Sequence, residues 1–205
     1  MTAIIDYGAG NLRSVQKACE FVGAQADITS DPNAIAAADH VILPGVGAFG
    51  DCMNSLRRNG LTDVIHQVTE RGTPFLGICL SMQLLFDSSE ESPGISGLGI
   101  FPGKIIKIPQ QEGFKIPHMG WNSLNFRKAS PIFAGLPEHP FVYFVHSYYM
   151  QPDDPAVIAA DTEYCGVLPV ALSRGNIFAT QFHPEKSGDI GLQILQNFTR
   201  TGGSR

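Results

Sequence analysis

The first 90 residues repeat one pattern three times: a short apolar run, a sharp turn and an amphipathic stretch. The turns lie around Gly10, Gly47 and Cys79. Strands that alternate with helices in this way are typical of an α/β protein with a doubly wound parallel sheet. In such a sheet, ligands bind beyond the carboxyl ends of the strands. We therefore expect the three turns to meet at one crevice.

The second half of the chain is less regular. Residues 87–94 are expected to form a polar loop, and glycine, proline and short β-branched runs then alternate to about residue 180. The expected strands of this half are 105–108, 141–145, 156–160, 167–172 and 177–181. A closing helix is expected over 190–198 and a frayed tail over 201–205. The second half is therefore predicted to be more antiparallel than the first.

Length and composition exclude several classes of protein. A chain of 205 residues can bury one substantial core, so 1–205 is expected to be a single domain. The net charge of −5 gives no basic surface for nucleic acid. No apolar run approaches the roughly 20 residues that span a bilayer, and the N-terminus does not resemble a secretory signal.

The four cysteines lie far apart, with no CxxC pair. This spacing argues against both a zinc site and a disulfide framework. A protein whose thiols stay reduced is expected in the cytoplasm. The sequence predicts no metal and no cofactor.

Cys79 is the first candidate for chemistry. It stands between an apolar strand, Phe75 to Ile78, and an amphipathic helix that begins at Leu80. A residue at such a turn has a strained backbone and an exposed side chain. The N–H groups of the following helix favour a thiolate, and Gly77 allows close backbone packing. A buried structural cysteine is the alternative interpretation.

A second candidate segment lies near the C-terminus. His183 follows an apolar strand, and Glu185 stands two residues later with Pro184 between them. A cysteine nucleophile needs a base that later returns the proton, and histidine does this near neutral pH. A carboxylate can orient the other ring nitrogen. The residues alone therefore predict a Cys-His-Glu set.

Two glycine-rich turns follow earlier strands. The turn at 8–10 lacks the third glycine and the lysine of phosphate-binding motifs, so a tight turn is favoured there. Asn11 and Arg13 remain candidates for a polar contact. The turn at 44–50 could align backbone N–H groups toward an oxyanion, or could be a flexible turn without a ligand.

These segments carry a family resemblance over essentially the whole chain. Gly77 to Gln83 and Phe182 to Glu185 resemble the nucleophile and His-Glu segments of class I glutamine amidotransferases. Asp6 to Val15, Pro44 to Phe49 and His118 to Asn122 narrow the resemblance to the glutaminase subunits of imidazole glycerol phosphate synthases. The expected fold is then flavodoxin-like, with a mostly parallel sheet flanked by helices and additional antiparallel strands in the second half.

The resemblance implies glutamine hydrolysis. Cys79 would attack the side-chain amide, His183 would act as base and then acid, and Glu185 would orient His183. An oxyanion hole is implied at the backbone N–H groups of Val46, Gly47 and Leu80. Positions that hold the amino-acid portion of glutamine are implied at Gln83, Glu91, Ser147 and Tyr148. Ser81 departs from the family, which usually has glycine two residues after the cysteine.

The resemblance also implies a partner. In the family, ammonia passes to a (β/α)₈-barrel cyclase subunit, which forms imidazole glycerol phosphate and an aminoimidazole carboxamide ribotide in histidine biosynthesis. A heterodimer is therefore expected. The implied interface positions are Asn11, Pro117, Met119, Trp121, Tyr143 and Lys186.

Three alternatives stay open from the residues. The chain could serve another amidotransferase, which feeds anthranilate, a nucleotide or pyridoxal phosphate. It could be a stand-alone cysteine hydrolase or redox sensor of the same fold. It could also be a regulatory binding domain with an incidental triad, in which case Cys79→Ala would leave its biological activity intact.

Overall fold

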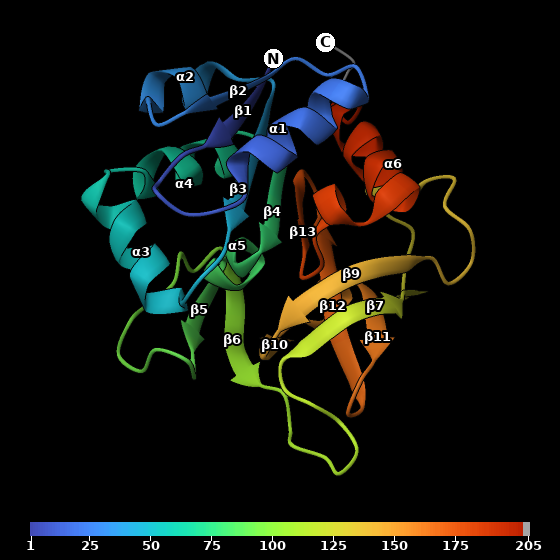
Figure 1. Ribbon diagram of the computed structural model, residues 1–205. Helices are drawn as coiled ribbons and strands as arrows, with labels where there is room; N and C mark the ends of the chain where they lie inside the picture. Colours follow the sequence, from blue (N-terminus) through green and yellow to red (C-terminus); the bar gives the residue numbers. More distant parts are fainter. Residues whose placement is uncertain (203–205) are drawn as a thin grey trace.

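An eight-stranded sheet crosses the molecule (Figure 1), and its strand order is β2-β1-β3-β4-β13-β12-β11-β8. The structure is a computed structural model that describes residues 1–202. The parallel part of the sheet consists of β1 (Thr2–Ile5), β2 (Ala26–Thr29), β3 (His40–Gly45), β4 (Phe75–Cys79) and β13 (Ile177–Thr180). The order 2-1-3-4 followed by the last parallel strand is that of flavodoxin-like proteins. The predicted fold class is confirmed.

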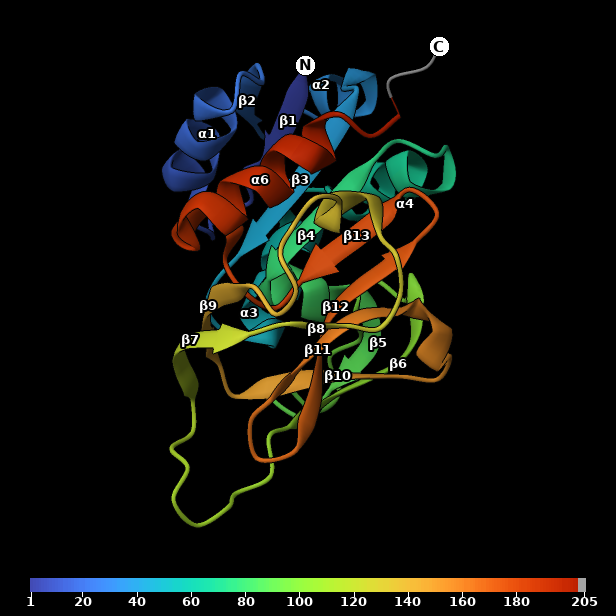
Figure 2. The same ribbon diagram turned by 90° about the vertical axis from the view of Figure 1, so that its right-hand side faces the viewer.

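Helices cover both faces of this parallel part (Figures 1 and 2). One face carries α1 (Leu12–Phe21) and α6 (Gly188–Thr199), and the other carries α2 (Pro32–Ala37), α3 (Phe49–Arg58) and α4 (Thr62–Glu70). Alternate residues of the strands enter two separate cores. Ile4 and Ile42 pack with α1 and α6, whereas Ile5 and Leu43 pack with the other three helices. Strands that are buried on both faces have continuous apolar sequences, which is why these strands could be predicted from the sequence.

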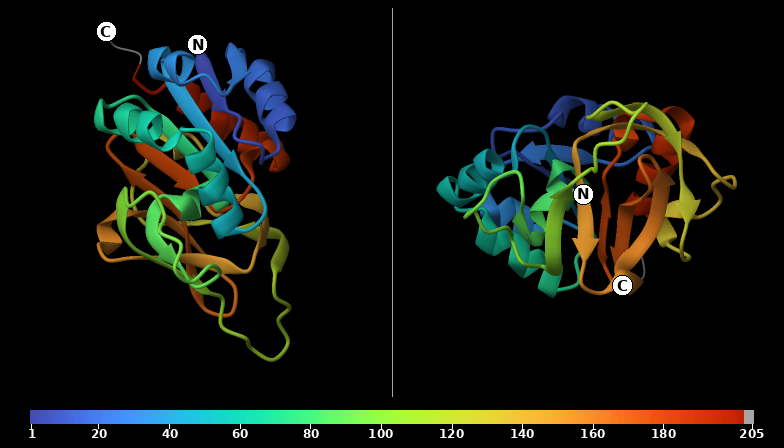
Figure 3. Two further views of the ribbon diagram at one scale, coloured as in Figure 1. Left: turned by 90° about the vertical axis from the view of Figure 1, so that its left-hand side faces the viewer. Right: turned by 90° about the horizontal axis from the view of Figure 1, so that it is seen from below.

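The second half extends the sheet with antiparallel strands, as predicted. These are β12 (Val167–Arg174), β11 (Ile158–Glu163) and β8 (Asn125–Phe126). A three-stranded sheet is formed by β5 (Phe86–Ser89), β6 (Phe101–Lys107) and β10 (Tyr148–Pro152). Short 3₁₀ turns occur at η1 (Pro131–Phe133), η2 (Pro155–Val157) and η3 (Pro184–Lys186). Figure 3 (left) shows the three-stranded sheet below the parallel core.

A two-stranded antiparallel ribbon, β7 (His118–Ser123) with β9 (Phe141–His146), lies beside the parallel core (Figure 1). Trp121 pairs with Tyr143 on its outer face, and Trp121 is 55% exposed. His118 pairs with His146 on its inner face, and both side chains are buried. The ribbon therefore presents aromatic groups outward and histidines inward.

Two expectations for the second half are corrected. Residues 87–94 are not entirely a loop, because β5 includes residues 87–89 and pairs in parallel with β6. Backbone pairing requires no apolar side chain, so a polar segment can form an edge strand. The strand expected over 156–160 begins only at Ile158, because Pro155–Val157 forms a 3₁₀ turn. Strand β7 was not predicted, since its sequence lacks β-branched alternation. Of the expected tail, residues 203–205 lie outside the described residues.

Candidate active site

Cys79 lies at the junction of β4 and the short helix α5 (Leu80–Leu84). Its φ of 56° is in the left-handed region, where a non-glycine residue is strained. Gly77 makes this turn possible, because a Cβ on it would lie 3.3 Å from the backbone N of Met82. The predicted strained turn and close packing are both present. Helix α5 is only five residues long, shorter than the sequence pattern suggested.

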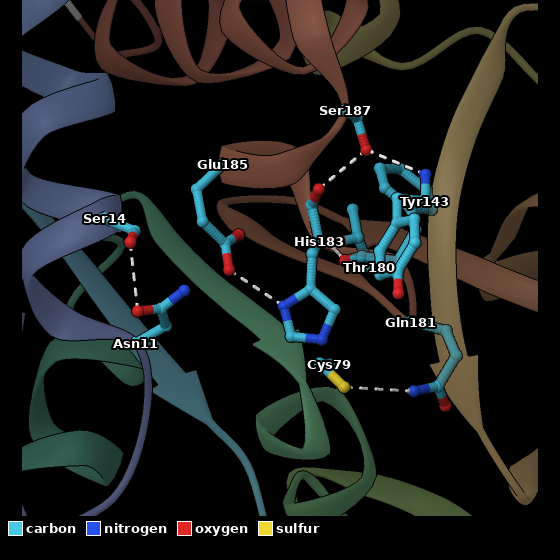
Figure 4. Close-up of polar contacts among 10 residues, drawn as sticks. Asn11, Ser14, Cys79, Tyr143, Thr180, Gln181, His183, Glu185 and Ser187 are labelled. Atoms are coloured by element: carbon cyan, nitrogen blue, oxygen red, sulfur yellow. Dashed lines mark hydrogen bonds and ion pairs between the residues drawn. The ribbon is translucent and has the colours of Figure 1, made fainter. Parts of the chain in front are cut away.

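His183 faces Cys79 from the loop after β13 (Figure 4). Its Nδ1 lies 2.8 Å from Oε1 of Glu185, and the two side chains are only 2% and 1% exposed. Nε2, the other ring nitrogen, has no hydrogen-bond partner among the described residues and points to the Cys79 sulfur. The structure therefore brings together the three residues of the predicted triad in the predicted order.

The pKa of His183 is set by opposing effects. Burial disfavours the imidazolium and lowers the pKa, whereas the contacts with Cys79 and Glu185 favour it. The contacts prevail and raise the pKa of His183 to about 10. A protonated imidazole beside sulfur stabilises a thiolate, which is the nucleophilic form of cysteine.

The backbone around His183 is held by a residue that sequence reasoning missed. The Ser187 hydroxyl donates to the His183 carbonyl at 2.6 Å and accepts from the Tyr143 N–H at 3.0 Å. The His183 N–H donates in turn to the Tyr143 carbonyl at 3.0 Å. The loop that carries His183 is thus tied to β9, and Figure 4 shows this bridge. A serine after a His-Glu segment gives no signal for this role in the sequence.

A pocket of about 320 Å³ opens beside the sulfur. Three predicted oxyanion residues line it, namely Val46, Gly47 and Leu80. The Val46 carbonyl accepts from the Cys52 thiol at 3.4 Å. Across a trans peptide the carbonyl and the next N–H point in opposite directions, so the Gly47 N–H points away from Cys52. Gly47 has a φ of 104°, which suits glycine.

The four predicted substrate residues line the same pocket, and they are Gln83, Glu91, Ser147 and Tyr148. Gln83 donates from Nε2 to the Tyr148 carbonyl at 3.3 Å. Glu91 accepts from the Phe49 N–H at the start of α3, at 2.7 Å. The lining of the pocket therefore includes both a carboxylate and an amide.

Gln181 is a second residue that sequence reasoning did not assign. Its Nε2 lies 3.7 Å from the Cys79 sulfur, and its Oε1 accepts from Gln83 at 2.8 Å. The side chain is fully buried. It stands two residues before His183, but its contact with Cys79 arises only because β13 pairs with β4.

The predicted interface residues lie on several separate segments, whereas the three triad residues meet at one point. Met119 and Trp121 are 62% and 55% exposed, and Tyr143 meets Trp121 edge-on at 6.1 Å between ring centroids. Lys186 is exposed and Pro117 lines the pocket. Asn11 lies on the Glu185 side of the triad in Figure 4, where its side-chain oxygen accepts from Ser14.

The three glycine-rich or strained turns were expected to meet at one crevice, and only two of them do. Gly47 and Cys79 line the pocket, but Gly10 does not. A Cβ on Gly10 would lie 3.0 Å from the side chain of Pro44, so this glycine serves close packing against the next strand end. Arg13 pairs with Gln16 on α1 and does not line the pocket.

Comparison with known proteins decides the family. The profile described as glutamine amidotransferase class-I matches residues 3–201. The chain belongs to the class I glutamine amidotransferases. It is 52% identical to the imidazole glycerol phosphate synthase subunit HisH of Syntrophotalea carbinolica over 203 residues, covering 97% of this chain and 98% of that protein. It is 53% identical to the HisH subunit of Thermosynechococcus vestitus, with coverage of 96% and 94%.

Solved structures of this amidotransferase fold are similar at low identity. PurLQS from Thermotoga maritima gives a TM-score of 0.76 at 20% identity, with 96% of each chain covered. A crystal structure of a glutamine amidotransferase gives 0.74 at 19% identity, with 96% of this chain and 98% of that chain covered. At these identities the likeness supports the fold alone.

Within residues 1–202, no group of three or more His, Cys, Asp or Glu side chains is placed to hold a metal ion. In the same part of the chain, no helix combines the length and apolarity needed to cross a membrane.

Ser81, the departure from the usual amidotransferase sequence, packs against Gly45 at the end of β3. Its hydroxyl is buried and has no hydrogen-bond partner within the described part of the chain. A Cβ on Gly45 would lie 2.5 Å from this hydroxyl and 2.7 Å from the Ser81 backbone N. The serine therefore fits only because the facing residue is glycine.

We expect Gly45→Ala to lower the free energy of unfolding by about 2 kcal/mol, a typical cost of overpacking. Urea unfolding measures this loss. The matched variant is Ser81→Gly, which restores the usual residue and removes an unpaired hydroxyl, so it should retain glutaminase activity. A Gly45→Ala protein with an unchanged unfolding midpoint would contradict the close packing described here.

Proposed function

We propose that Cys79, His183 and Glu185 hydrolyse glutamine in the pocket above β4, and that the ammonia passes to a cyclase subunit. The buried alignment of these three side chains carries the proposal. The chain functions as a glutaminase subunit of imidazole glycerol phosphate synthase in histidine biosynthesis, an assignment that rests on its 52% identity to a HisH protein over nearly the full chain. We place this single amidotransferase domain, 1–205, in the cytoplasm.

The first half-reaction forms a thioester. The Cys79 thiolate attacks the side-chain amide carbon of glutamine, and the C=O π bond opens to an oxyanion. Backbone N–H groups of Val46, Gly47 and Leu80 are the proposed donors to this oxyanion. The imidazolium of His183 gives its proton to the amide nitrogen, the C–N bond breaks, and ammonia leaves.

The second half-reaction releases glutamate. His183 is now neutral and takes a proton from water, which attacks the thioester carbon. The C–S bond breaks and restores the Cys79 thiolate, while His183 keeps the proton that it took from water. Glutamate leaves, and its new carboxylic acid releases its proton to solvent. Glu185 holds the ring in one orientation and stabilises its charge through the contact of 2.8 Å.

The amino-acid portion of glutamine is assigned to the polar residues of the pocket wall. Glu91 supplies a carboxylate that suits the ammonium group. Gln83 and the Ser147–Tyr148 segment supply amide and backbone groups for the remaining polar atoms. All of these residues line the pocket around Cys79.

The outer face of the β7–β9 ribbon is the proposed cyclase surface. Exposed aromatic and methionine side chains are enriched at the centres of protein interfaces. Met119, Trp121 and Tyr143 form such a group beside the pocket-lining Pro117. Lys186 extends the surface from the loop that holds His183, and Asn11, just before α1, is a further proposed interface position. Together with a (β/α)₈-barrel cyclase, this chain would form a heterodimer.

The experiment measures glutamate release from glutamine by the chain alone, with a cyclase subunit, and with the cyclase plus its nucleotide ligand. We expect weak release alone and a rise of at least about tenfold, which corresponds to a coupling free energy of order 1–3 kcal/mol. Equal rates in all three conditions would overturn the partner assignment. No glutamate in any condition would overturn the proposed chemistry.

A further inference from the structure

The inner face of the β7–β9 ribbon carries two histidines that the hydrolysis above does not use. His118 and His146 are 3% and 5% exposed. Nδ1 of His118 lies 3.0 Å from Nε2 of His146. The His118 ring is also stacked on Phe144 at 4.7 Å and on Tyr164 at 3.9 Å between centroids. Two imidazoles in direct contact inside a protein require a defined arrangement of protons.

The positions of the protons on the two rings follow from the acceptor at the end of the chain of hydrogen bonds, the Tyr148 carbonyl. Nδ1 of His146 lies 2.9 Å from the Tyr148 carbonyl, which can only accept, so this nitrogen carries the hydrogen. Burial keeps His146 neutral by lowering its pKa to about 3, which leaves Nε2 as an acceptor. His118 must then donate from Nδ1. Its own Nε2 accepts from the Asn122 amide at 3.3 Å.

The Asn122 amide fixes the other end of this chain of hydrogen bonds. Its Oδ1 accepts from the Ser123 N–H at 2.8 Å, and its Nδ2 donates to the Glu163 carbonyl at 3.0 Å. These two contacts allow only one orientation of the amide. Burial also lowers the pKa of His118 to about 4, so both rings are neutral at pH 7. The hydrogen bonds therefore run in one direction, from Asn122 through both histidines to the Tyr148 carbonyl.

This chain of hydrogen bonds, which we call the relay, ends at the glutamine pocket. His146 and Tyr148 both line it. The Tyr148 carbonyl that accepts from His146 also accepts from Gln83 at 3.3 Å. The same Gln83 nitrogen donates to Gln181, whose amide faces the Cys79 sulfur. The Tyr148 carbonyl and the Gln181 amide oxygen together set the direction of the Gln83 amide.

We propose that His118 and His146 are positioning residues for the glutamine pocket. Their one-way chain of hydrogen bonds fixes the Tyr148 carbonyl and, through it, the Gln83 side chain. The proposal rests on the proposed glutaminase function, because it assigns the pocket to glutamine. Neither ring needs to touch the reacting atoms. Their effect falls on substrate binding more than on the chemical step, so it appears in KM more than in kcat.

Two substitutions at His118 separate hydrogen bonding from packing. His118→Phe keeps a ring between Phe144 and Tyr164 but removes the donor to His146. His118→Asn loses the stack but keeps a side-chain N–H near the position of Nδ1. Both are assayed as the complex with a cyclase subunit and its ligand. We expect His118→Phe to raise KM for glutamine about tenfold with kcat changed less than about twofold, because a buried acceptor loses its partner.

The KM values of these two variants decide whether His118 acts through its hydrogen bond or through packing. A KM for His118→Asn near the wild-type value would support the relay. A KM that is normal in His118→Phe and raised in His118→Asn would overturn it, since the ring would then serve only packing. Tyr164→Leu, which removes one stacking partner and no relay hydrogen bond, is the matched control and should leave KM unchanged.

A spectroscopic measurement covers the case in which a variant fails to fold. Imidazole ¹⁵N NMR of the wild-type chain should show both rings neutral with hydrogen on Nδ1 between pH 6 and 8. A charged ring, or hydrogen on Nε2 of either ring, would overturn the relay. Absence of glutamate release by the wild-type complex would instead refute the proposed function, and the NMR result would still test the relay.

Discussion

Replacing Cys79 with alanine is expected to lower glutamate release at least about 10³-fold, because covalent catalysis is lost with the proposed nucleophile. Substrate binding should persist, since Gln83 and Glu91 stay in place on the pocket wall. Rates are measured in the complex with a cyclase subunit and its ligand, where the wild-type rate is highest. Glutamine binding to the variant is measured separately by calorimetry.

The control for this variant is Cys19→Ala. Cys19 is buried in α1, and burial raises the pKa of its thiol to about 12, so it is inert as a nucleophile. Its loss should leave kcat within about twofold and cost only stability through a small cavity. Substantial glutamate release by Cys79→Ala would mean that another group attacks the amide.

Glu185→Gln is expected to lower kcat by about 10²–10⁴-fold, the usual contribution of a positioned acid-base group. The amide keeps the size of the side chain but removes the charge 2.8 Å from His183 Nδ1. It can also present an N–H to that nitrogen, which would favour the wrong tautomer. KM should change little, because Glu185 does not line the pocket.

The pH profile gives this prediction a second readout. In the proposed mechanism His183 carries the proton that releases ammonia, so wild-type activity should fall as pH rises through the His183 pKa of about 10. Glu185 is one of the groups that raise this pKa. Without its charge the pKa falls, and the basic limb should move to lower pH. Glu138→Gln, on an exposed loop, is the matched control. An unmoved basic limb in Glu185→Gln would contradict the assigned role.

Local features made the parallel half and the triad predictable from sequence. The strands beneath the site are continuous apolar runs, and the turn at Cys79 follows from one strand meeting one helix. His183 and Glu185 are two residues apart, so their contact needs only a suitable turn, which η3 provides.

The features that were missed depend on contacts between distant segments. Gln181 faces Cys79 only after β13 pairs with β4, and Ser187 bridges to Tyr143 across more than forty residues. The His118–His146 pair exists because β7 and β9 pair in one register. A shift of one strand by one residue would move its histidine to the opposite face of the ribbon and break the pair. No pattern within a single segment carries that information.

The most direct test of the central claim is covalent labelling with a chloromethyl ketone analogue of glutamine, followed by peptide mass spectrometry. We predict one label per chain on Cys79, formed in parallel with loss of glutaminase activity and prevented by excess glutamine. Cys79→Ala should take up no label under the same conditions. Complete inactivation with the label on another residue, or with Cys79 unmodified, would contradict the assignment of Cys79 as the nucleophile of this amidotransferase.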